Sequence, residues 1–278
     1  SKEGELEDKL YFYLKDDAYK LKTGVSKRHE MLFAFRGPGG EPAAAECAAF
    51  ETPPILKASP EWYCGSGAFL DILPARPELG GVFTSYEEAV TLGVTDYLKS
   101  RESGREYGML NYGDWWGERG RNWGNIEYDT QYAAFLQFVR SGDERCYWIG
   151  QDAARHNRDV DMVWAGDPHT VGKVYAHCIG HTGNYYDHNI NDQGTAGGGF
   201  TVSHTWVEGY LADYFLSGDQ RGLEAATLCA DTATAYPLDI PADFELDEAQ
   251  NARLDAYLSQ RFQGQFSMAG VRFWSGMR

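Results

Sequence analysis

The spacing of the hydrophobic residues changes near residue 85. In residues 8–36, short apolar runs such as 10–14 and 30–35 are separated by polar turns, a pattern that predicts three short antiparallel strands. Residues 41–84 mix apolar residues with prolines and glycines and are expected to be irregular. From residue 85 onward, apolar residues recur three and four positions apart, which predicts helices over residues 85–98, 129–140, 144–163, 205–216, 221–236 and 246–262.

The first two of these helices have a clear expected start and inward face. Ser85 and Glu88 form a capping-box pattern, so Ser85 is expected to cap the helix over 85–98. Its expected inward residues are Ala89, Leu92, Gly93, Tyr97 and Leu98. The expected inward residues of the helix over 129–140 are Tyr132, Ala133, Phe135, Leu136 and Val139.

Two of the predicted helices end in the same tripeptide. Ser141-Gly142-Asp143 closes the helix over 129–140, and Ser217-Gly218-Asp219 closes the helix over 205–216; an alanine-rich helix follows each. Helical hairpins repeated along a chain build α-solenoids or closed (α/α) toroids. The sequence therefore predicts a mainly α fold made of helical hairpins, in which the loops over 103–127 and 164–204 open on one rim.

Residues 107–208 hold six of the seven histidines and six of the eight tryptophans. Many of them lie in two segments without helical or strand periodicity, 111–129 and 177–188, together with tyrosines, asparagines and glycines. Aromatic rings stack on sugars, and histidines exchange protons near neutral pH, so such loops are typical of a site for a polar ligand. The alternative is that these rings fill the interior of the protein.

The charge of the chain narrows the class of ligand. A net charge of −16 and a pI near 4.8 argue against nucleic acid or an anionic membrane as a partner. Arg119, Arg121, Arg155 and Arg158 nevertheless offer a local positive site for an anionic sugar. No apolar run approaches the roughly 20 residues that span a bilayer. Five scattered cysteines allow at most two disulfides and make a cysteine-bound structural metal unlikely by spacing.

Seven stretches, taken in order, resemble the exo-acting rhamnogalacturonan lyases and their bacterial relatives. They are Gly24-Val25-Ser26-Lys27-Arg28-His29-Glu30, Ser59-Pro60-Glu61-Trp62-Tyr63-Cys64, Asn111-Tyr112-Gly113-Asp114-Trp115, Asn125-x-Glu127-Tyr128-Asp129, Ala154-Arg155-His156-x2-Asp159-Val160-Asp161, His177-x3-His181-Thr182-Gly183 and His204-Thr205-Trp206-Val207-Glu208-Gly209. The resemblance covers residues 8–235 and implies a polysaccharide lyase or a close relative, built from a β-sandwich and a C-terminal (α/α) toroid. It implies that residues 1–40 are strands of the sandwich, 41–84 a linker and 85–278 the toroid. Members of the family are longer at both ends, so the chain is expected to be a fragment of a larger polypeptide.

A lyase acting on a uronic acid removes the proton at C5, neutralises the carboxylate and protonates the departing oxygen at C4. The residue types favour His181 or Tyr185 as base, Tyr112 or Tyr186 as acid, and Asn111 with Arg121 as the carboxylate clamp. The other expected substrate-binding residues are Arg119, Asn122, Asn125, Trp115, Trp116, Trp123, His177, His188 and His204. The expected partner is an acidic polysaccharide, met in a secreted, extracellular or periplasmic setting.

Other interpretations of these residues stay open. His177 and His181 stand four apart, as metal ligands on a helix would, but Gly180 and Gly183 favour a loop, so neither a metal nor another cofactor is expected. A glycoside hydrolase would need two carboxylates, available among Asp114, Glu127, Asp129, Asp187 and Glu208. Asp129 also stands where a helix cap would. A non-catalytic glycan-binding protein is the third alternative. His29, remote in sequence, is expected to be structural.

Overall fold

The computed structural model describes residues 24, 26–38, 40, 44–107, 112–116, 123–124, 129–168, 170–175, 200–201, 205–235, 247–249 and 251–253. These residues are mainly helical, with 61% in helices, which confirms the predicted class. The helices are α2 (Ala44–Glu51), α3 (Pro60–Gly65), η2 (Pro77–Leu79), α4 (Val82–Gly104), α5 (Thr130–Ser141), α6 (Glu144–His156), the π-helix η4 (Asn157–Asp161), α7 (Glu208–Ser217) and α8 (Gln220–Ala235). Two antiparallel strand pairs join β1 (Trp115–Trp116) to β2 (Trp123–Gly124) and β3 (Val174–Tyr175) to β4 (Phe200–Thr201).

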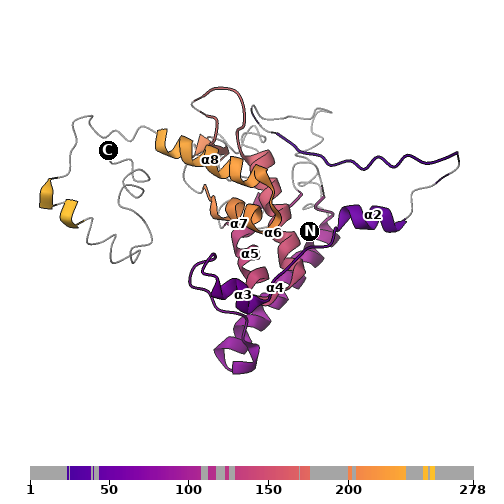
Figure 1. Ribbon diagram of the computed structural model, residues 1–278, viewed down its shortest axis with the longest axis horizontal. Helices are drawn as coiled ribbons and strands as arrows, with labels where there is room; N and C mark the ends of the chain where they lie inside the picture. The colour runs from indigo at the N-terminus through magenta and orange to yellow at the C-terminus, as the bar shows by residue number, and fades with distance from the viewer. Residues whose placement is uncertain are drawn as a thin grey trace, which may run out of the picture.

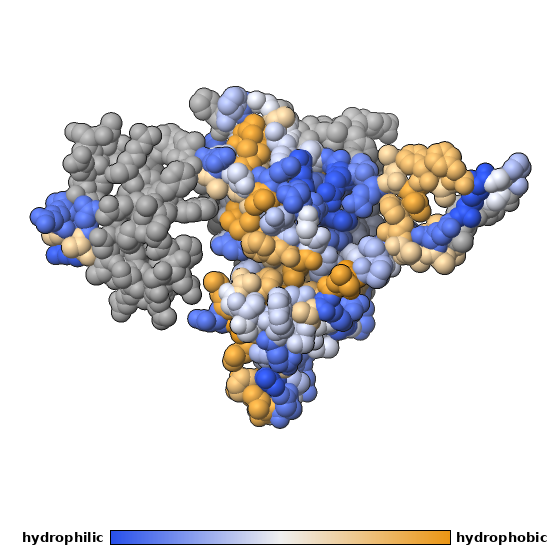
Figure 2. All heavy atoms as spheres, in the orientation of Figure 1, coloured by the Kyte–Doolittle hydropathy of each residue, from blue (hydrophilic) through white to orange (hydrophobic). Residues whose placement is uncertain are grey.

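The segment before α2 is extended but unpaired. Residues 26–37 carry no strand, so the prediction of a strand over 30–35 is wrong, and the two earlier predicted strands lie outside the described residues. Met31, Phe33 and Phe35 are exposed, and α2 buries none of its residues. Figure 2 shows the apolar residues gathered over this segment and α2. A strand needs a partner for its backbone N–H and C=O groups, and for residues 30–35 none of the described residues provides one.

The stretch expected to be irregular, 41–84, contains three short helices and the start of α4. In α3, the Ser59 side chain accepts a hydrogen bond from the Trp62 amide at 3.3 Å, and Pro60 occupies the first turn, where its missing N–H costs nothing. The helix α4 begins at Val82 after Gly81, not at a Ser85 cap. Leu92, expected to face inward, is 60% exposed, whereas Arg101 of the same helix is buried.

The helices α5 to α8 form two hairpins that use one turn design. Gly142 and Gly218 both adopt left-handed backbone, with φ of 73° and 77°, and their amides donate to the carbonyls of Phe138 and Tyr214. The aspartate after each glycine caps the next helix. Asp143 accepts a hydrogen bond from the Arg145 amide and Asp219 accepts one from the Arg221 amide, both at 3.0 Å. Figure 1 shows the four helices gathered at the centre of the molecule. The repeated Ser-Gly-Asp sequence therefore marks a repeated structure.

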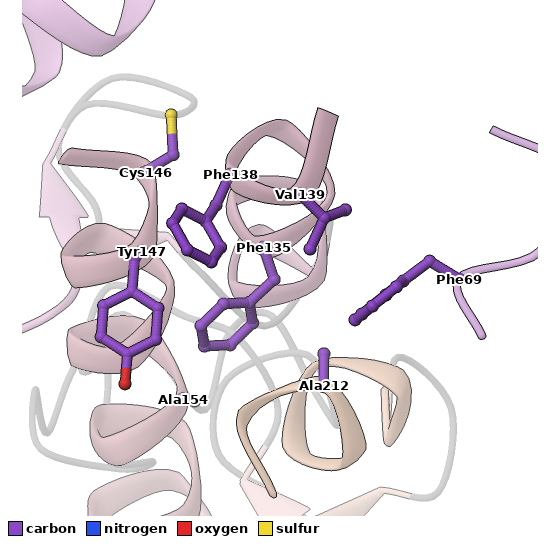
Figure 3. Packing of buried hydrophobic residues seen from close by; sticks show 8 residues of the cluster. All are labelled: Phe69, Phe135, Phe138, Val139, Cys146, Tyr147, Ala154 and Ala212. Carbon is purple, nitrogen blue, oxygen red and sulfur yellow. The ribbon is translucent and has the colours of Figure 1, made fainter. Parts of the chain in front are cut away.

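The main core lies where α5, α6 and α7 meet. Its buried members are Phe69, Phe135, Phe138, Val139, Cys146, Tyr147, Ala154 and Ala212. Figure 3 shows Phe135 and Phe138 of α5 turned toward Tyr147 of α6, whose ring centroid lies 6.1 and 5.2 Å from theirs. Phe135 and Val139 confirm the predicted inward face of α5, but Ala133 is exposed, and the buried Phe138 was not predicted.

A second apolar cluster joins the two hairpins. Met162 and Val174 pack with Tyr210 of α7 and with Ala225, Ala226 and Cys229 of α8. The four cysteines in the described part of the chain (Cys47, Cys64, Cys146 and Cys229) are free thiols. No helix in the described ranges has the length and apolar content needed to cross a membrane.

A buried ionic cluster, the Arg158 cluster, ties these hairpins together. Arg158 of the π-helix η4 is fully buried and donates to Asp213 of α7 and to Asp219 of the second turn, both at 2.6 Å. Asp213 is also fully buried. Asp219 additionally accepts two hydrogen bonds from Arg28, at 3.1 and 2.8 Å. The cluster therefore connects the N-terminal segment, the end of the first hairpin and the second hairpin.

We expect Arg158→Met to destabilise the protein by about 3–5 kcal/mol, because it leaves Asp213 buried without its cation. The matched control is Arg145→Met in the equivalent first turn, where Arg145 and Asp143 form a solvent-exposed pair. That change should cost less than about 1 kcal/mol. Urea unfolding of the two variants measures the difference. Equal losses would show that the buried cluster contributes no more than its exposed counterpart.

Candidate functional site

Most of the predicted site lies outside the described residues. This holds for His177, His181, Tyr185, Tyr186 and His188 of one loop, for Asn111, Arg119, Arg121, Asn122 and Asn125 of the other, and for His204. The backbones of Trp115, Trp116 and Trp123 are described: they belong to the β1–β2 pair, in which Trp116 is the partner of Trp123. Among the residues predicted for the lyase mechanism and its substrate contacts, Tyr112 is the one whose side chain is described.

Tyr112 borders a cavity of about 280 Å³, the tyrosine cavity. The two tyrosines of this cavity follow α4 in the chain. Its charged residues come from the N-terminal segment, from the end of α6 and from η4. The lining residues are Lys27, Arg28, His29, Glu30, Tyr107, Tyr112, Arg155 and Asp159. Sequence reasoning missed Lys27, Arg28, Tyr107 and Asp159, and it treated His29 as structural. His29 is among the residues that line the cavity.

The backbone around Gly113 holds Tyr112 in place. Gly113 has a φ of 90°, and a Cβ at this position would collide with the backbone oxygen of Asp152 in α6, so only glycine lets the chain pass so close. The ring N–H at Nδ1 of His156 donates to the Tyr112 carbonyl at 3.0 Å. Burial, with a smaller effect from the Lys27 charge, lowers the pKa of His156 to about 3. This histidine is therefore neutral and serves to position the Tyr112 backbone.

Arg101 contacts the rings of three tyrosines. Its guanidinium carbon lies 5.8, 5.6 and 5.7 Å from the ring centroids of Tyr97, Tyr107 and Tyr112, within cation–π range. The same guanidinium forms a buried ion pair with Asp152 at 2.9 Å. Burial, helped by the negative charge of Asp152, raises the pKa of Tyr112 well above its ordinary value. Tyr112 is therefore a protonated phenol that can donate a proton but holds it in the absence of an acceptor.

The N-terminal segment is fixed to the helical body on the opposite side of the cavity. The Ser26 amide donates to the Asp159 carbonyl at 3.1 Å, and the Arg28 amide donates to the Asp159 carboxylate at 3.1 Å. The Trp164 amide donates to the Gly24 carbonyl at 2.7 Å. These bonds place Lys27 at the cavity wall with only 20% of its side chain exposed, 3.9 Å from Asp159. Burial lowers the pKa of Lys27, and Asp159 opposes that effect.

Arg155 is the guanidinium of this cavity with the weaker pairing among the described residues. Within those residues its Nη2 pairs with the exposed Glu30 over 3.6 Å, and its buried Nε has no hydrogen-bond partner. Arg28, by contrast, is paired through two hydrogen bonds with Asp219. A guanidinium presents five donors in a fixed fork that matches a carboxylate. The cavity can therefore hold the carboxylate of an anionic ligand at Arg155, and Tyr112 lines the same cavity.

A second group of polar residues lies at the starts of α5 and α7. Asp129, in left-handed backbone with φ of 48°, caps α5 by accepting from the Tyr132 amide at 3.2 Å, as its position in the sequence indicated. Burial raises the pKa of Asp129 to about 7 against that hydrogen bond, and the charge of Glu208 at the start of α7 adds to the rise. The fully buried side-chain amide of Gln131, packed on Gly209, has no partner among the described residues. Asp129 and Glu208, both predicted as carboxylates for a hydrolase, thus lie within electrostatic reach of each other.

Within the described residues no three of His, Cys, Asp and Glu are grouped as metal ligands would be, and His177 and His181 lie outside those residues.

We expect Asp129→Asn to flatten the dependence of stability on pH. A carboxyl whose pKa rises on folding adds stability below its unfolded pKa of about 3.9, and this stability is lost as the pH rises through about 7. Asparagine stays neutral, caps helices and tolerates left-handed backbone, so the variant should be more stable than the parent at pH 8, by on the order of a few kcal/mol. Urea unfolding between pH 4 and pH 8 measures the effect.

The control is Asp143→Asn at the cap of α6. The hydrogen bond from the Arg145 side chain lowers the pKa of Asp143, so this carboxylate stabilises the protein above about pH 4. Its replacement should therefore lower stability at pH 8, opposite in sign to Asp129→Asn. If both variants shift in the same direction, Asp129 is not the group that titrates.

The chain matches no protein-family model, and it matches no curated protein.

Proposed function

We propose that the chain is a polysaccharide lyase that cleaves a uronic-acid-containing, rhamnogalacturonan-like polysaccharide by β-elimination. The observation that carries the proposal is the tyrosine cavity, which combines an incompletely paired arginine, Arg155, with a half-buried tyrosine, Tyr112, that keeps its proton. The arginine can bind the carboxylate of an anionic sugar, and the tyrosine can protonate the departing sugar oxygen. The acidic surface of the chain as a whole makes this local positive site the place where an anionic glycan is attracted.

Arg155 is assigned to the substrate carboxylate, with Lys27 close by. Removal of the C5 proton leaves negative charge that spreads into the carboxylate, and a cation held there in advance stabilises that charge. Glu30 now faces Arg155 through a long contact from a carboxylate that is about half exposed, and such pairs contribute little. A substrate carboxylate can replace it at small cost. The sequence also predicted that Asn111 and Arg121 bind the substrate carboxylate. That stays a prediction, because both residues lie outside the described part of the chain.

Tyr112 is assigned to the proton donor. As the C5 proton leaves, the electron pair forms the C4=C5 double bond, the C4–O4 bond breaks, and the departing oxygen takes the phenolic proton. In the unliganded protein the Tyr112 hydroxyl is hydrogen-bonded to Asp152, so it must turn from that carboxylate toward the substrate oxygen. The base stays as predicted from the sequence, His181 or Tyr185, with Tyr186 as the alternative acid.

The finer architecture and setting belong to the same proposal. The hairpins α5–α6 and α7–α8, with their common turn, are consistent with part of an (α/α) toroid. We assign the tyrosine cavity to the rim on which the two long loops open. The partner is an acidic polysaccharide met outside the cytoplasm.

A glycan screen tests the activity directly. β-Elimination creates a conjugated 4,5-unsaturated uronide that absorbs in the ultraviolet, so polymers containing galacturonate or glucuronate, alternating or uniform, are incubated with the protein and followed by absorbance. We expect absorbance to rise with an alternating uronate polymer and to stay flat with neutral glycans. Cleavage of a neutral glycan, or of a uronate polymer without the absorbing product, contradicts the lyase assignment.

We expect Tyr112→Phe to lower kcat at least ~100-fold while KM changes little, because the phenol acts on the departing oxygen and not on binding. Tyr107→Phe is the comparison within the cavity, since the Tyr107 hydroxyl is bonded to Glu102. Tyr86→Phe on the exposed part of α4 should be as active as the parent. A larger loss of kcat for Tyr107→Phe than for Tyr112→Phe would show that Tyr107, and not Tyr112, is the proton donor.

The carboxylate pair supports a second candidate, a glycoside hydrolase. Asp129, with a pKa raised to about 7, is suited to donate a proton near neutral pH, and Glu208 is the exposed carboxylate beside it. The two candidates separate by product and by variant. If the chain is a hydrolase, Asp129→Asn and Glu208→Gln should abolish hydrolysis. If it is a lyase, the same variants should leave elimination intact. A protein that only binds glycans should give no product in either assay.

A further inference from the structure

The buried ring of His156 lies between hydrogen-bond acceptors on both of its edges. Nδ1 is 3.0 Å from the Tyr112 carbonyl oxygen, and Nε2 is 3.4 Å from the Asp161 carboxylate, at the outer limit of a hydrogen bond. The Asp114 carboxylate lies on the same edge as Asp161, 3.8 Å from Nε2, and both aspartates are fully buried. A neutral imidazole carries one N–H, so it cannot donate to the carbonyl and to a carboxylate at the same time.

We propose that Asp161 keeps a proton at neutral pH and donates it to Nε2 of His156, so that the neutral ring can hold the Tyr112 carbonyl through Nδ1. Asp161 is then a positioning residue, which acts on Tyr112 through His156. One buried proton would set the backbone position of Tyr112 whichever reaction the chain catalyses.

The π-helix η4 brings the two side chains together. His156 is the last residue of α6, and Asp161 is the fifth residue after it and the last of η4. In an α-helix a residue five positions on lies roughly 140° around the axis, away from the first. The wider turn of a π-helix, with its i→i+5 hydrogen bonds, returns that residue to the same side. The local departure from α-helix thus places Asp161 beside the imidazole.

The hydrogen bonds of Asn157 show how Asp161 can hold a proton. The Tyr210 hydroxyl donates to Oδ1 of Asn157, and Nδ2 of Asn157 donates to Oδ2 of Asp161 at 3.2 Å. A protonated carboxyl oxygen can accept that bond and still donate its own proton. Asp161 is a better holder of the proton than Asp114, because its oxygen lies closer to Nε2.

The surroundings favour the proton on a carboxyl group over the ring. Burial lowers the pKa of His156, and the positive charge of Lys27 acts in the same direction, while Asp159 opposes it. Two buried carboxylates at one edge of the ring repel each other, which favours a proton on one of them. Burial raises the pKa of Tyr97 and of Tyr210, so neither phenol adds a charge. The titratable and charged groups that face the pair are Lys27 of the N-terminal segment, Tyr97 of α4, Asp114, Asp159 of η4 and Tyr210 of α7.

Loss of this proton at high pH has a defined consequence for Tyr112. A charged Asp161 attracts the single N–H of the neutral ring to Nε2. The lone pair of Nδ1 then faces the Tyr112 carbonyl oxygen, and the two repel each other. Tyr112 therefore loses the donor that holds its backbone against α6, and the wall of the tyrosine cavity shifts.

Nitrogen NMR of the full chain with labelled histidine tests the arrangement. At pH 7 we expect the His156 ring to carry its proton on Nδ1 and none on Nε2. As the pH is raised, the signals should change to those of a ring protonated on Nε2. The His156 signals are identified by their loss in His156→Gln. A ring protonated on both nitrogens at pH 7, or on Nε2 alone, overturns the proposal.

Asp161→Asn is the matched variant, because its side-chain amide donates to Nε2 as a protonated carboxyl would. We expect this variant to keep the proton on Nδ1 at every pH at which it is folded. The infrared band of a protonated carboxylic acid should be weaker than in the parent at pH 7; Asp129 contributes to that band equally in both proteins.

Asp114→Asn is the control and should retain both the band and the pH dependence of the ring. If Asp114→Asn removes them and Asp161→Asn does not, the assignment of the proton to Asp161 is wrong. The NMR spectra of the parent decide the question if Asp161→Asn fails to fold.

Discussion

The fully buried Arg158, held between Asp213 and Asp219, is the interaction on which the rest of the structure depends. Removing a guanidinium and a carboxylate from water is expensive, and only short, well-directed hydrogen bonds offset that cost. Both bonds measure 2.6 Å, and they join η4 to α7 and to the turn after it. A shift of one hairpin against the other would break these hydrogen bonds and leave the charge of Arg158 buried without a partner.

The same cluster sets the walls of the tyrosine cavity. Arg28 shares the Asp219 carboxylate with Arg158, and burial, which alone would raise the pKa of Asp219, is outweighed by these two cations so that the pKa falls to about 2. Asp219 is thus charged throughout the ordinary pH range. Lys27 precedes Arg28 in the chain, and Arg155 stands one turn before Arg158, so the cations of the cavity are placed by the cluster that joins the hairpins.

The sequence predicts local features of this fold well. Helical spacing located α5 to α8 to within a few residues, and the two Ser-Gly-Asp turns were visible because glycine and an aspartate cap leave a sequence signature. The strand over 30–35 was wrong because an apolar run fixes neither a partner nor a sheet. The face of α4 was misjudged at Leu92 because that helix buries an arginine, Arg101, through an aspartate on α6, which periodicity does not reveal.

The tyrosine cavity was predictable only in part, for a similar reason. Tyr112 was recognised from its loop, but Lys27 and His29 come from a segment whose position depends on backbone hydrogen bonds to Asp159, far along the chain. No spacing rule connects those two regions. The stretches from 24 to 30 and from 154 to 161, both quoted for the family resemblance, contain the lining residues other than the two tyrosines, and only the fold shows that they border one cavity.

The aromatic surroundings of Arg101 have a consequence for selectivity. Three tyrosine rings and the Asp152 carboxylate already occupy that guanidinium, and Asp213 and Asp219 occupy those of Arg158 and Arg28. An incoming anion therefore does not meet a diffuse field of positive charge in which it could settle in many orientations. Among the described cations that line the tyrosine cavity, Arg155 is the guanidinium with the weakest pairing, so it is the one that can fix the direction in which a bound anion lies.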